Sequence, residues 1–255
     1  MTELHLKEQR NIYLPYMDLL DRCFAENQGA SDGATESPRS TRTKEMLAEY
    51  MAGVLFWNEK INLTAIKEPE EFVLKHYADS LALLSCPEYQ GAKRIIDMGT
   101  GGGFPGIPLA IASPNKAFTL ADSLNKRLRV IDSLAAEIGI NNISTLHGRA
   151  EDIGRIEGER ESYDLCTSRA VADMAVLAEL TLPLVKVGGY LAAYKSMDID
   201  KELDGAAKAI KTLGGRLARV QQTLEGHSIV FIEKVSETPS KYPRKAGAPS
   251  KTPIR

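Results

Sequence analysis

The sequence has few cysteines, and their placement excludes two kinds of site. Cys23, Cys86 and Cys166 are odd in number and far apart among 255 residues, so they give neither a disulfide framework nor metal-ligand spacing. Such cysteines are typical of thiols in a reducing compartment. Cys166 lies inside an expected strand, and we interpret it as a buried thiol rather than a nucleophile. We expect no metal site.

The sequence also lacks a long apolar run, a signal peptide and an excess of charge. No run approaches the roughly 20 apolar residues that a membrane span needs, and the N-terminus lacks the pattern of a signal peptide. The formal net charge is −2, so no global positive field attracts nucleic acid. We therefore expect a cytoplasmic protein that contacts neither membrane nor DNA, and a monomer.

What is present is sufficient for a globular protein with a proper core, since 43% of the residues are apolar and 26% are charged. Charge is uneven only at the end of the chain, where basic residues face Glu237 alone. They are Lys241, Arg244, Lys245, Lys251 and Arg255. This tail, residues 237–255, offers contacts to phosphate groups; a disordered tail without a binding role is the alternative.

A glycine-rich stretch, residues 93–106, is the most informative part of the chain. Ile95 and Ile96 predict a short buried strand that ends at Asp97, and four glycines follow within the five positions 99–103. A helical pattern resumes at Phe104. Strand, glycine turn and helix in this order are typical of a crevice that binds a nucleotide-like cofactor.

The residues on either side divide the chain into three parts. Residues 1–90 carry helical patterns over 12–24, from 43 onward and from Pro69 onward, with a polar loop expected at 27–42, so they predict an N-terminal helical extension. Residues 91–236 alternate between strands and helices, which predicts an α/β domain with a parallel sheet. The basic tail forms the third part.

The expected strands of the α/β domain are the one before the glycine turn and those at 117–121, 142–146, 163–167, 190–194, 216–220 and 228–235. Gly188 and Gly189 are predicted to turn the chain into the strand at 190. The last two strands are separated by too short a loop for a helical crossover, so they should pair antiparallel. A mostly parallel sheet that ends in an antiparallel hairpin is the expected topology.

Two cofactors are compatible with the glycine turn. Gly101, Gly103 and Gly106 satisfy G-x-G-x-x-G, the weak fingerprint of a dinucleotide site. Asp97 directly before the turn favours S-adenosylmethionine, because a carboxylate there suits the ammonium of a methionine moiety and repels a pyrophosphate. The antiparallel hairpin also favours a class I, Rossmann-like methyltransferase over an NAD domain.

Longer motifs resemble one family in particular, the RsmG (GidB) family. They are W-N-E-K-I-N-L-T at 57–64, K-H-Y-A-D-S at 75–80, D-M-G-T-G-G-G-F-P-G-I-P at 97–108, D-S-L-N-K-R at 122–127, R-A-E-D at 149–152, S-R-A-V at 168–171, A-Y-K-S at 193–196 and the tail at 241–254. The resemblance implies methylation of N7 of one guanine in 16S ribosomal RNA with S-adenosylmethionine. Naked RNA and the 30S subunit both remain possible substrates.

The resemblance also implies roles for particular residues. Gly99, Gly101 and Phe104 lie where the family binds the cofactor, beside Asp97. Asp122 resembles the acid that accepts hydrogen bonds from the ribose hydroxyls, although it also suits a helix N-cap.

Two further positions follow the expected third strand, where class I enzymes hold adenine. There the resemblance implies contacts from the backbone N–H of Ala150 and from the side chain of Glu151.

Substrate-side residues are expected at the ends of the later strands. The resemblance makes Arg169 both a cofactor-binding and a catalytic residue, and its planar fork suits guanine O6 or a phosphate. Arg127 and Lys195 are candidates for RNA phosphate contacts, with solvated charges as the alternative. His76 is interpreted as a hydrogen-bonded core residue. Asn62 and Thr64 either line the base pocket or cap a helix.

Two other functions compete with an RNA methyltransferase. One is a small-molecule methyltransferase whose helical extension acts as a lid, and the other is a ribosome-associated binding protein without turnover. No His/Asp or Cys-based catalytic pair accompanies the glycine turn. Guanine N7 needs none, because its in-plane lone pair attacks the methyl group without deprotonation, so positioning is the main requirement.

Overall fold

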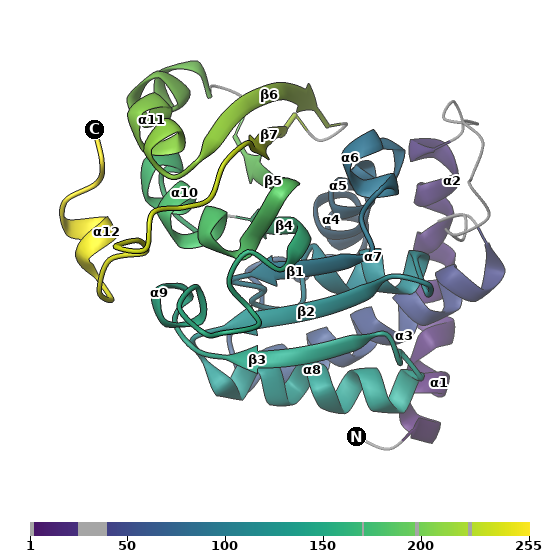
Figure 1. Cartoon of the computed structure of the whole chain (residues 1–255). Helices are drawn as coiled ribbons and strands as arrows, with labels where there is room; N and C mark the ends of the chain where they lie inside the picture. Colours follow the sequence, from purple (N-terminus) through teal and green to yellow (C-terminus); the bar gives the residue numbers. More distant parts are fainter. Residues whose placement is uncertain (1–2, 25–39, 170, 197–198, 224–225) are drawn as a thin grey trace.

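The computed structural model describes residues 3–24, 40–169, 171–196, 199–223 and 226–255. A seven-stranded sheet in the order β3-β2-β1-β4-β5-β7-β6 organises it (Figure 1). The strands are β1 (Arg94–Met98), β2 (Ala117–Asp122), β3 (Ile143–His147), β4 (Tyr163–Arg169), β5 (Val185–Lys195), β6 (Gly215–Gln222) and β7 (Ser228–Lys234). Strands β1 to β5 pair in parallel, whereas β7 runs antiparallel to both β5 and β6. The predicted topology is confirmed.

The inner strands of the sheet are buried on both faces, whereas the edge strands β3 and β6 are partly exposed. A helix follows each parallel strand. These helices are α7 (Gly106–Ala112), α8 (Asn125–Ile138), α9 (Ala150–Ile153), α10 (Met174–Thr181) and α11 (Asp200–Thr212). Neighbouring residues of β1 alternate between two cores: Ile95 packs with α7 and α8, and Ile96 packs with α10 and α11. The carboxyl ends of the parallel strands therefore meet at one edge of a covered sheet, which is where α/β proteins bind ligands.

The residues before β1 are helical, as predicted, and they share the core on the α7–α8 face. They form α1 (Glu3–Tyr13), a 3-10 turn (Leu14–Asp18), α2 (Leu19–Cys23), α3 (Thr41–Asn58), α4 (Pro69–Phe72), a π-helical turn (Val73–Ala78), α5 (Asp79–Leu81), a 3-10 turn (Ala82–Ser85) and α6 (Pro87–Gln90). The helix predicted at 12–24 is wrong at its start, because α1 begins at Glu3 and the chain tightens to 3-10 geometry at Pro15.

Of the loop predicted at 27–42, residues 27–39 lie outside the described residues, and the remaining part is helical from Thr41. Ser40 caps α3, since its hydroxyl accepts the backbone N–H of Thr43 at 3.1 Å. The turn predicted at Gly188 and Gly189 lies inside β5 and not before it. Gly188 has a φ of 86°, and the pairing of β5 with β4 shifts register between Tyr163 and Leu165.

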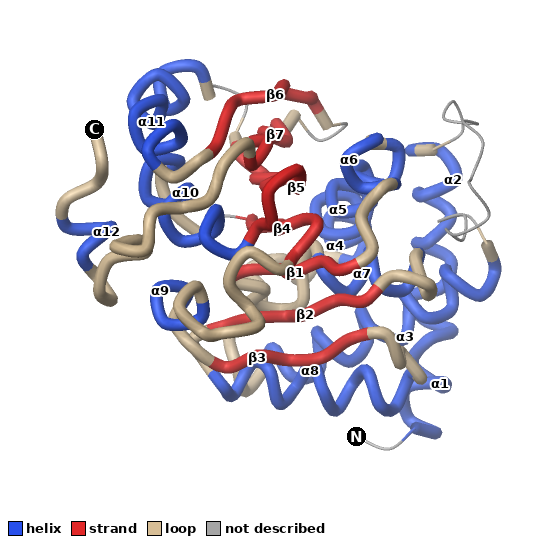
Figure 2. Tube along the Cα trace, in the orientation of Figure 1, coloured by secondary structure: helices blue, strands red, loops and turns tan. Residues whose placement is uncertain are grey.

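The C-terminal segment is folded against the α10 side of the molecule and contains the short helix α12 (Ala248–Lys251) (Figure 2). Arg244 is bound to Glu179 of α10, whose carboxylate accepts its Nε at 2.8 Å and its Nη2 at 2.6 Å. The alternative of a disordered tail is therefore wrong. Among the described residues, no helix combines the length and the apolar character needed to cross a membrane.

Candidate active site

A cleft of about 900 Å³ opens at the carboxyl edge of the sheet. One wall is the glycine turn, from Gly99 to Phe104. The loop at 63–66 and the π-helical turn that carries His76 line the cleft next to the glycine turn and pack against it. Strand ends supply the remaining charged groups, including Arg169 and Lys195. The cleft thus lies between the helical extension and the α/β domain, and residues from both parts line it.

The glycine turn needs glycine for two different reasons. Gly99, Gly101 and Gly103 have φ angles of 75°, 59° and 87°, in the left-handed region that residues with a Cβ avoid. A Cβ on Gly103 would also lie 2.3 Å from the hydroxyl of Tyr50. At Gly101, in contrast, the nearest atom to such a Cβ is the carbonyl oxygen of Gly99 at 3.9 Å, so this part of the wall is bare backbone.

Asp97 holds the turn from below. Its Oδ2 accepts the hydroxyl of Thr100 at 2.7 Å and the backbone N–H of Gly106 at 3.0 Å, and its Oδ1 accepts the hydroxyl of Thr167 at 2.9 Å. Burial raises the pKa of Asp97, while these three hydrogen bonds act in the opposite direction. Asp97 is fully buried, so the structure gives it the role of ordering the turn.

Asp122 lies at the end of β2, directly beside the turn. Its Oδ2 accepts the N–H of Gly101 at 3.0 Å, and its Oδ1 accepts the N–H of Leu124 at 2.8 Å. Arg127 approaches the same carboxylate with its Nη1 at 3.6 Å from Oδ2. The acid predicted to bind ribose therefore also fixes the turn, and Arg127 on the rim of the cleft is paired rather than free.

Phe104 lines the cleft, as predicted, and stacks on His76. The two rings are 4.3 Å apart at an interplanar angle of 7°. His76 is buried and hydrogen-bonded, which confirms that part of its interpretation, but it also lines the cleft. Burial and the positive charge of Arg169 lower the pKa of His76 to about 3, so the imidazole is neutral at physiological pH.

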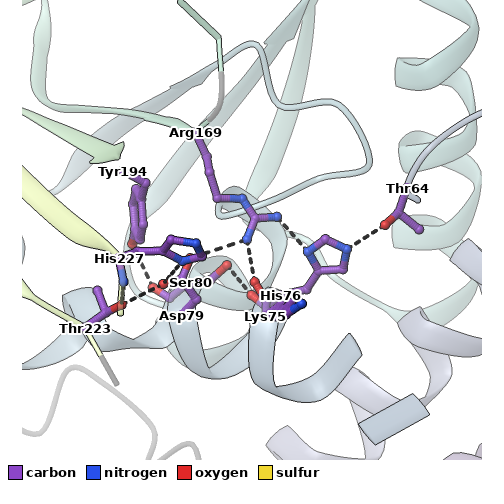
Figure 3. A network of polar contacts seen from close by, with 9 residues as sticks. All are labelled: Thr64, Lys75, His76, Asp79, Ser80, Arg169, Tyr194, Thr223 and His227. Carbon is purple, nitrogen blue, oxygen red and sulfur yellow. Dashed lines mark hydrogen bonds and ion pairs between the residues drawn. The ribbon is translucent and has the colours of Figure 1, made fainter. Parts of the chain in front are cut away.

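Arg169 reaches from the end of β4 across the cleft to the helical extension (Figure 3). Its Nη1 donates to the carbonyl oxygen of Lys75 at 2.8 Å, and its Nη2 donates to Nδ1 of His76 at 2.8 Å. The carboxylate of Asp79 lies 3.6 Å from Nη1. Burial lowers the pKa of Arg169, and the charge of Asp79 raises it. The predicted catalytic residue is thus fixed beside the glycine turn.

Lys195 also lines the cleft, at the end of β5. Its Nζ donates to the carbonyl oxygen of Ala172 and to Oε1 of Glu202 at 2.6 Å. Only 11% of its side chain is exposed. In the structure Lys195 therefore ties the loop after β4 to α11, which limits its reach toward a phosphate.

Ala150 and Glu151 lie at the next strand end, where α9 begins after β3. They are not among the residues that line the cleft, but β3 is paired to β2 beside Asp122. Glu151 is buried, and its Oε1 accepts the backbone N–H of Gly247 at 2.8 Å. Six of the ten predicted residues thus line the cleft, Asp97 and Asp122 hold the turn behind it, and these two lie one strand further along.

Sequence reasoning missed several residues of the site. Asn58 organises the loop at 63–66, because its side chain accepts the N–H groups of Leu63 and Thr64 and donates to the carbonyl oxygen of Thr64. Asp79 and His227 line the cleft and contact each other at 3.2 Å. Asp79 stands in the motif K-H-Y-A-D-S, but the sequence could not show that it approaches Arg169.

Thr64 lines the cleft, as one of its two interpretations required. Asn62 contacts this region through its backbone, since its carbonyl oxygen accepts a hydrogen bond from Nη2 of Arg127 at 3.4 Å. Cys166 is fully buried, and burial raises the pKa of its thiol, which confirms the prediction of an inert cysteine.

The residues of the cleft fit S-adenosylmethionine. The bare backbone at Gly101 leaves room for close approach of a ligand, and a Cβ there would occupy that wall. Two buried carboxylates lie directly behind this wall, that of Asp97 below the turn and that of Asp122 beside it, and their negative charge suits a cationic methyl donor and not a pyrophosphate. A volume of about 900 Å³ is ample for a nucleoside and a second ligand group.

Comparison with known proteins supports the same interpretation. Residues 43–230 match the family described as GidB, rRNA small subunit methyltransferase G. A protein named ribosomal RNA small subunit methyltransferase G from Clostridium botulinum (strain Eklund 17B / Type B) is 46% identical over 204 residues, covering 78% of this chain and 85% of that protein. A protein of the same name from Clostridium perfringens (strain 13 / Type A) is 40% identical over 247 residues, covering 95% of this chain and 100% of that protein.

A solved structure shows the fold at lower identity. The S-adenosylmethionine-dependent methyltransferase from Aquifex aeolicus aligns with a TM-score of 0.50 and 17% identity, over 64% of this chain and 93% of that one. At this identity the likeness concerns the Rossmann-like methyltransferase fold.

Proposed function

The chain belongs to the rRNA small subunit methyltransferase G family, and we propose that its cleft is where the methyl group of S-adenosylmethionine passes to N7 of a guanine in 16S ribosomal RNA. One observation carries this assignment. The bare glycine turn and the guanidinium of Arg169 line the same cleft, so a methyl donor against the turn and a base beside Arg169 come into contact there.

The cofactor supplies an electrophilic methyl group when it is bound. The chain supplies its binding site: Gly99 and Gly101 form the wall, and Asp122 offers its remaining lone pairs to the ribose hydroxyls. We propose that Ala150 and Glu151, one strand along, receive the adenine. Glu151 is buried, and its carboxylate is oriented by the backbone N–H of Gly247. A fixed orientation suits a carboxylate that accepts a hydrogen bond from the adenine.

The residues on the substrate side have to orient the guanine rather than activate it. N7 carries an in-plane lone pair at neutral pH, so no proton has to be removed before it attacks. The neutral His76 is consistent with this requirement, because its Nδ1 is already an acceptor for Arg169 and cannot serve as a base toward the guanine. Arg169 then provides N–H donors for guanine O6 or a neighbouring phosphate.

The helical extension, residues 1–90, completes the substrate side of this cleft, and residues 91–236 hold the cofactor. Arg127 and Lys195 belong to the rim that faces the RNA, where Arg127 is the better candidate for a phosphate contact because 29% of its side chain is exposed. We further propose that the protein acts in the cytoplasm as a monomer on 16S RNA or the 30S subunit, and not on DNA.

A methyl-transfer assay tests the assignment. Purified protein is incubated with radiolabelled S-adenosylmethionine and 30S subunits, or naked 16S RNA, from a strain that lacks the enzyme. Label should appear in 16S RNA at a single guanine N7. A protein that binds S-adenosylmethionine in calorimetry but labels small metabolites and not RNA would instead be a small-molecule methyltransferase, and one that labels nothing would be a binding protein.

A further inference from the structure

We propose that His76 is a positioning residue for the methyl transfer, a neutral imidazole that fixes the plane of the Arg169 guanidinium through its Nδ1. The inference rests on the proposed function, since it concerns how Arg169 meets the RNA. His76 belongs to the helical extension, so the inference gives this part of the chain a role in orienting Arg169 as well as in covering the cleft. Figure 3 shows the polar contacts of His76 with Arg169 and Thr64, and those of Arg169 with Lys75 and Asp79.

The contacts of His76 leave one protonation state. Arg169 has only donors, so Nδ1 of His76, at 2.8 Å from its Nη2, has to accept. Nε2 lies 2.7 Å from the hydroxyl oxygen of Thr64, which also accepts the backbone N–H of Ile66 at 3.0 Å. A neutral ring with its proton on Nε2 satisfies both contacts, because it accepts from Arg169 and donates to Thr64.

The ring cannot rotate away from this arrangement without losing its packing. One face of His76 stacks on Phe104 with ring centres 4.3 Å apart, and Phe72 contacts it edge-on at 4.8 Å. Phe104 belongs to the glycine turn, and its ring centre lies 5.4 Å from the guanidinium carbon of Arg169. Phe104 of the glycine turn, the imidazole and the guanidinium therefore pack together beside Gly99 and Gly101, where we propose that the cofactor binds.

Asp79 neutralises Arg169 without orienting it. Its Oδ1 is engaged by the hydroxyl of Thr223 at 3.0 Å and by Nδ1 of His227 at 3.2 Å. Its Oδ2 is buried and has no hydrogen-bond partner among the described residues, and it lies 3.6 Å from Nη1 of Arg169. Attraction between charges at that distance depends weakly on angle, whereas a hydrogen bond depends on it strongly.

The direction of the guanidinium is thus set by two acceptors, the carbonyl oxygen of Lys75 and Nδ1 of His76. A guanidinium has five N–H donors, so these two bonds leave donors for the substrate. Without the acceptor at Nδ1 the charge would remain, but the carbonyl oxygen of Lys75 alone would hold the guanidinium plane less firmly. The expected loss is therefore in kcat, because the methyl donor is bound elsewhere on the turn.

Two amide substitutions separate the acceptor from the bulk of the ring. In His76→Asn the amide oxygen takes the place of Nδ1, and in His76→Gln the amide takes the place of Nε2. We expect His76→Asn to retain kcat within about fivefold and His76→Gln to lose kcat by about 30-fold or more, in line with the loss of one preorganising contact. KM for S-adenosylmethionine should be unchanged in both variants. The kcat of Thr64→Val should lie between those of His76→Asn and His76→Gln.

The measurements are kcat and KM with labelled S-adenosylmethionine and 30S subunits, with calorimetry of cofactor binding and thermal unfolding as controls for folding. Equal activity of the two amide variants, or higher activity of His76→Gln, would overturn the proposal. Failure of the wild-type protein to label 16S RNA would instead overturn the proposed function.

The nitrogen-15 spectrum of the imidazole tests the proposal without any assay of activity. In the wild-type protein it should show a neutral ring protonated at Nε2. A ring protonated at Nδ1, or at both nitrogens near pH 7, would overturn the positioning role even if both variants failed to fold.

Discussion

Gly247 donates its backbone N–H to Oε1 of Glu151 over 2.8 Å, and this bond joins the C-terminal segment to the end of β3. The segment is held there by side chains of the α/β domain. Arg160 donates to the carbonyl oxygens of Thr238 and Tyr242 at 2.6 and 2.9 Å, and Arg155 donates to that of Pro243. The basic tail is therefore a strap across the end of β3, beside the residues that we propose to hold the adenine.

We expect removal of residues 245–255 to weaken binding of S-adenosylmethionine about tenfold. The truncation keeps Arg244 but deletes the donor that orients Glu151, and a hydrogen bond to a charged acceptor is worth about 1.5 kcal/mol. Calorimetric titration measures the change in Kd. In a double-mutant cycle, Glu151→Ala should weaken S-adenosylmethionine binding by a similar factor in the full-length protein. In the truncated protein the same substitution should weaken binding little further. Unchanged affinity of the truncated protein would contradict the role of the strap.

Arg244→Ala should lower the free energy of unfolding by about 3 kcal/mol. Glu179 has 1% of its side chain exposed, and the substitution removes both side-chain donors that neutralise it. Arg216→Ala is the matched control, because the Arg216–Glu233 pair is at the surface and should contribute little. Chemical denaturation measures both variants. Equal, small effects would show that the tail is not anchored through Glu179.

The sequence predicted the part of the site that depends on local chain geometry. The turn after β1 follows from glycines that no strand or helix favours, and the antiparallel pairing of β6 with β7 follows from the short loop between them. Asp97 and Asp122 were predicted at strand ends, although their hydrogen bonds to Gly106 and Gly101 were not.

What the sequence could not predict are contacts between distant segments. Arg169 and Lys75 are 94 residues apart, and no pattern in either segment indicates the other. The composition of the tail was compatible with disorder, and the partners that fold it, Arg160 and Glu179, belong to the α/β domain. The sequence indicated the bend at Gly188 and Gly189 but not its place inside β5. Gly188 has a φ of 86°, and position 189 requires glycine because a Cβ would lie 2.6 Å from the carbonyl oxygen of Asp164 on β4, where the register is irregular.

Gly103→Ala should abolish the binding of S-adenosylmethionine or unfold the turn, whereas Gly139→Ala should not. Both glycines have φ near 85°, at 87° and 85°, so both substitutions carry the strain of the left-handed region, about 1–2 kcal/mol. Only at Gly103 would the new Cβ meet protein atoms, the hydroxyl of Tyr50 at 2.3 Å and Cγ1 of Ile107 at 2.8 Å. Calorimetry and thermal unfolding compare the two. Equal losses of binding and stability in the two variants would mean that backbone strain alone accounts for the effect, and not the packing of the glycine turn on α3.

The stability of the protein should fall at acidic pH through His76. Its pKa is about 3 in the folded protein, against about 6.5 in the unfolded chain, because burial and Arg169 disfavour the imidazolium. Above pH 6.5 neither state binds the proton. As the pH falls below that value, the unfolded chain is protonated and the folded protein is not, so the free energy of unfolding decreases.

Between pH 6.5 and 4.5 this contribution amounts to about 2 kcal/mol, lost as the solution becomes more acidic. Other groups titrate in the same range, so the quantity to measure is the difference in free energy of unfolding between the wild-type protein and His76→Asn. This difference should decrease by about 2 kcal/mol as the pH falls from 6.5 to 4.5. Proton spectra of His76 provide the direct check, since its ring should not titrate above pH 5. A titration midpoint near 6.5 would mean that His76 meets solvent and is not enclosed between Phe104 and Arg169.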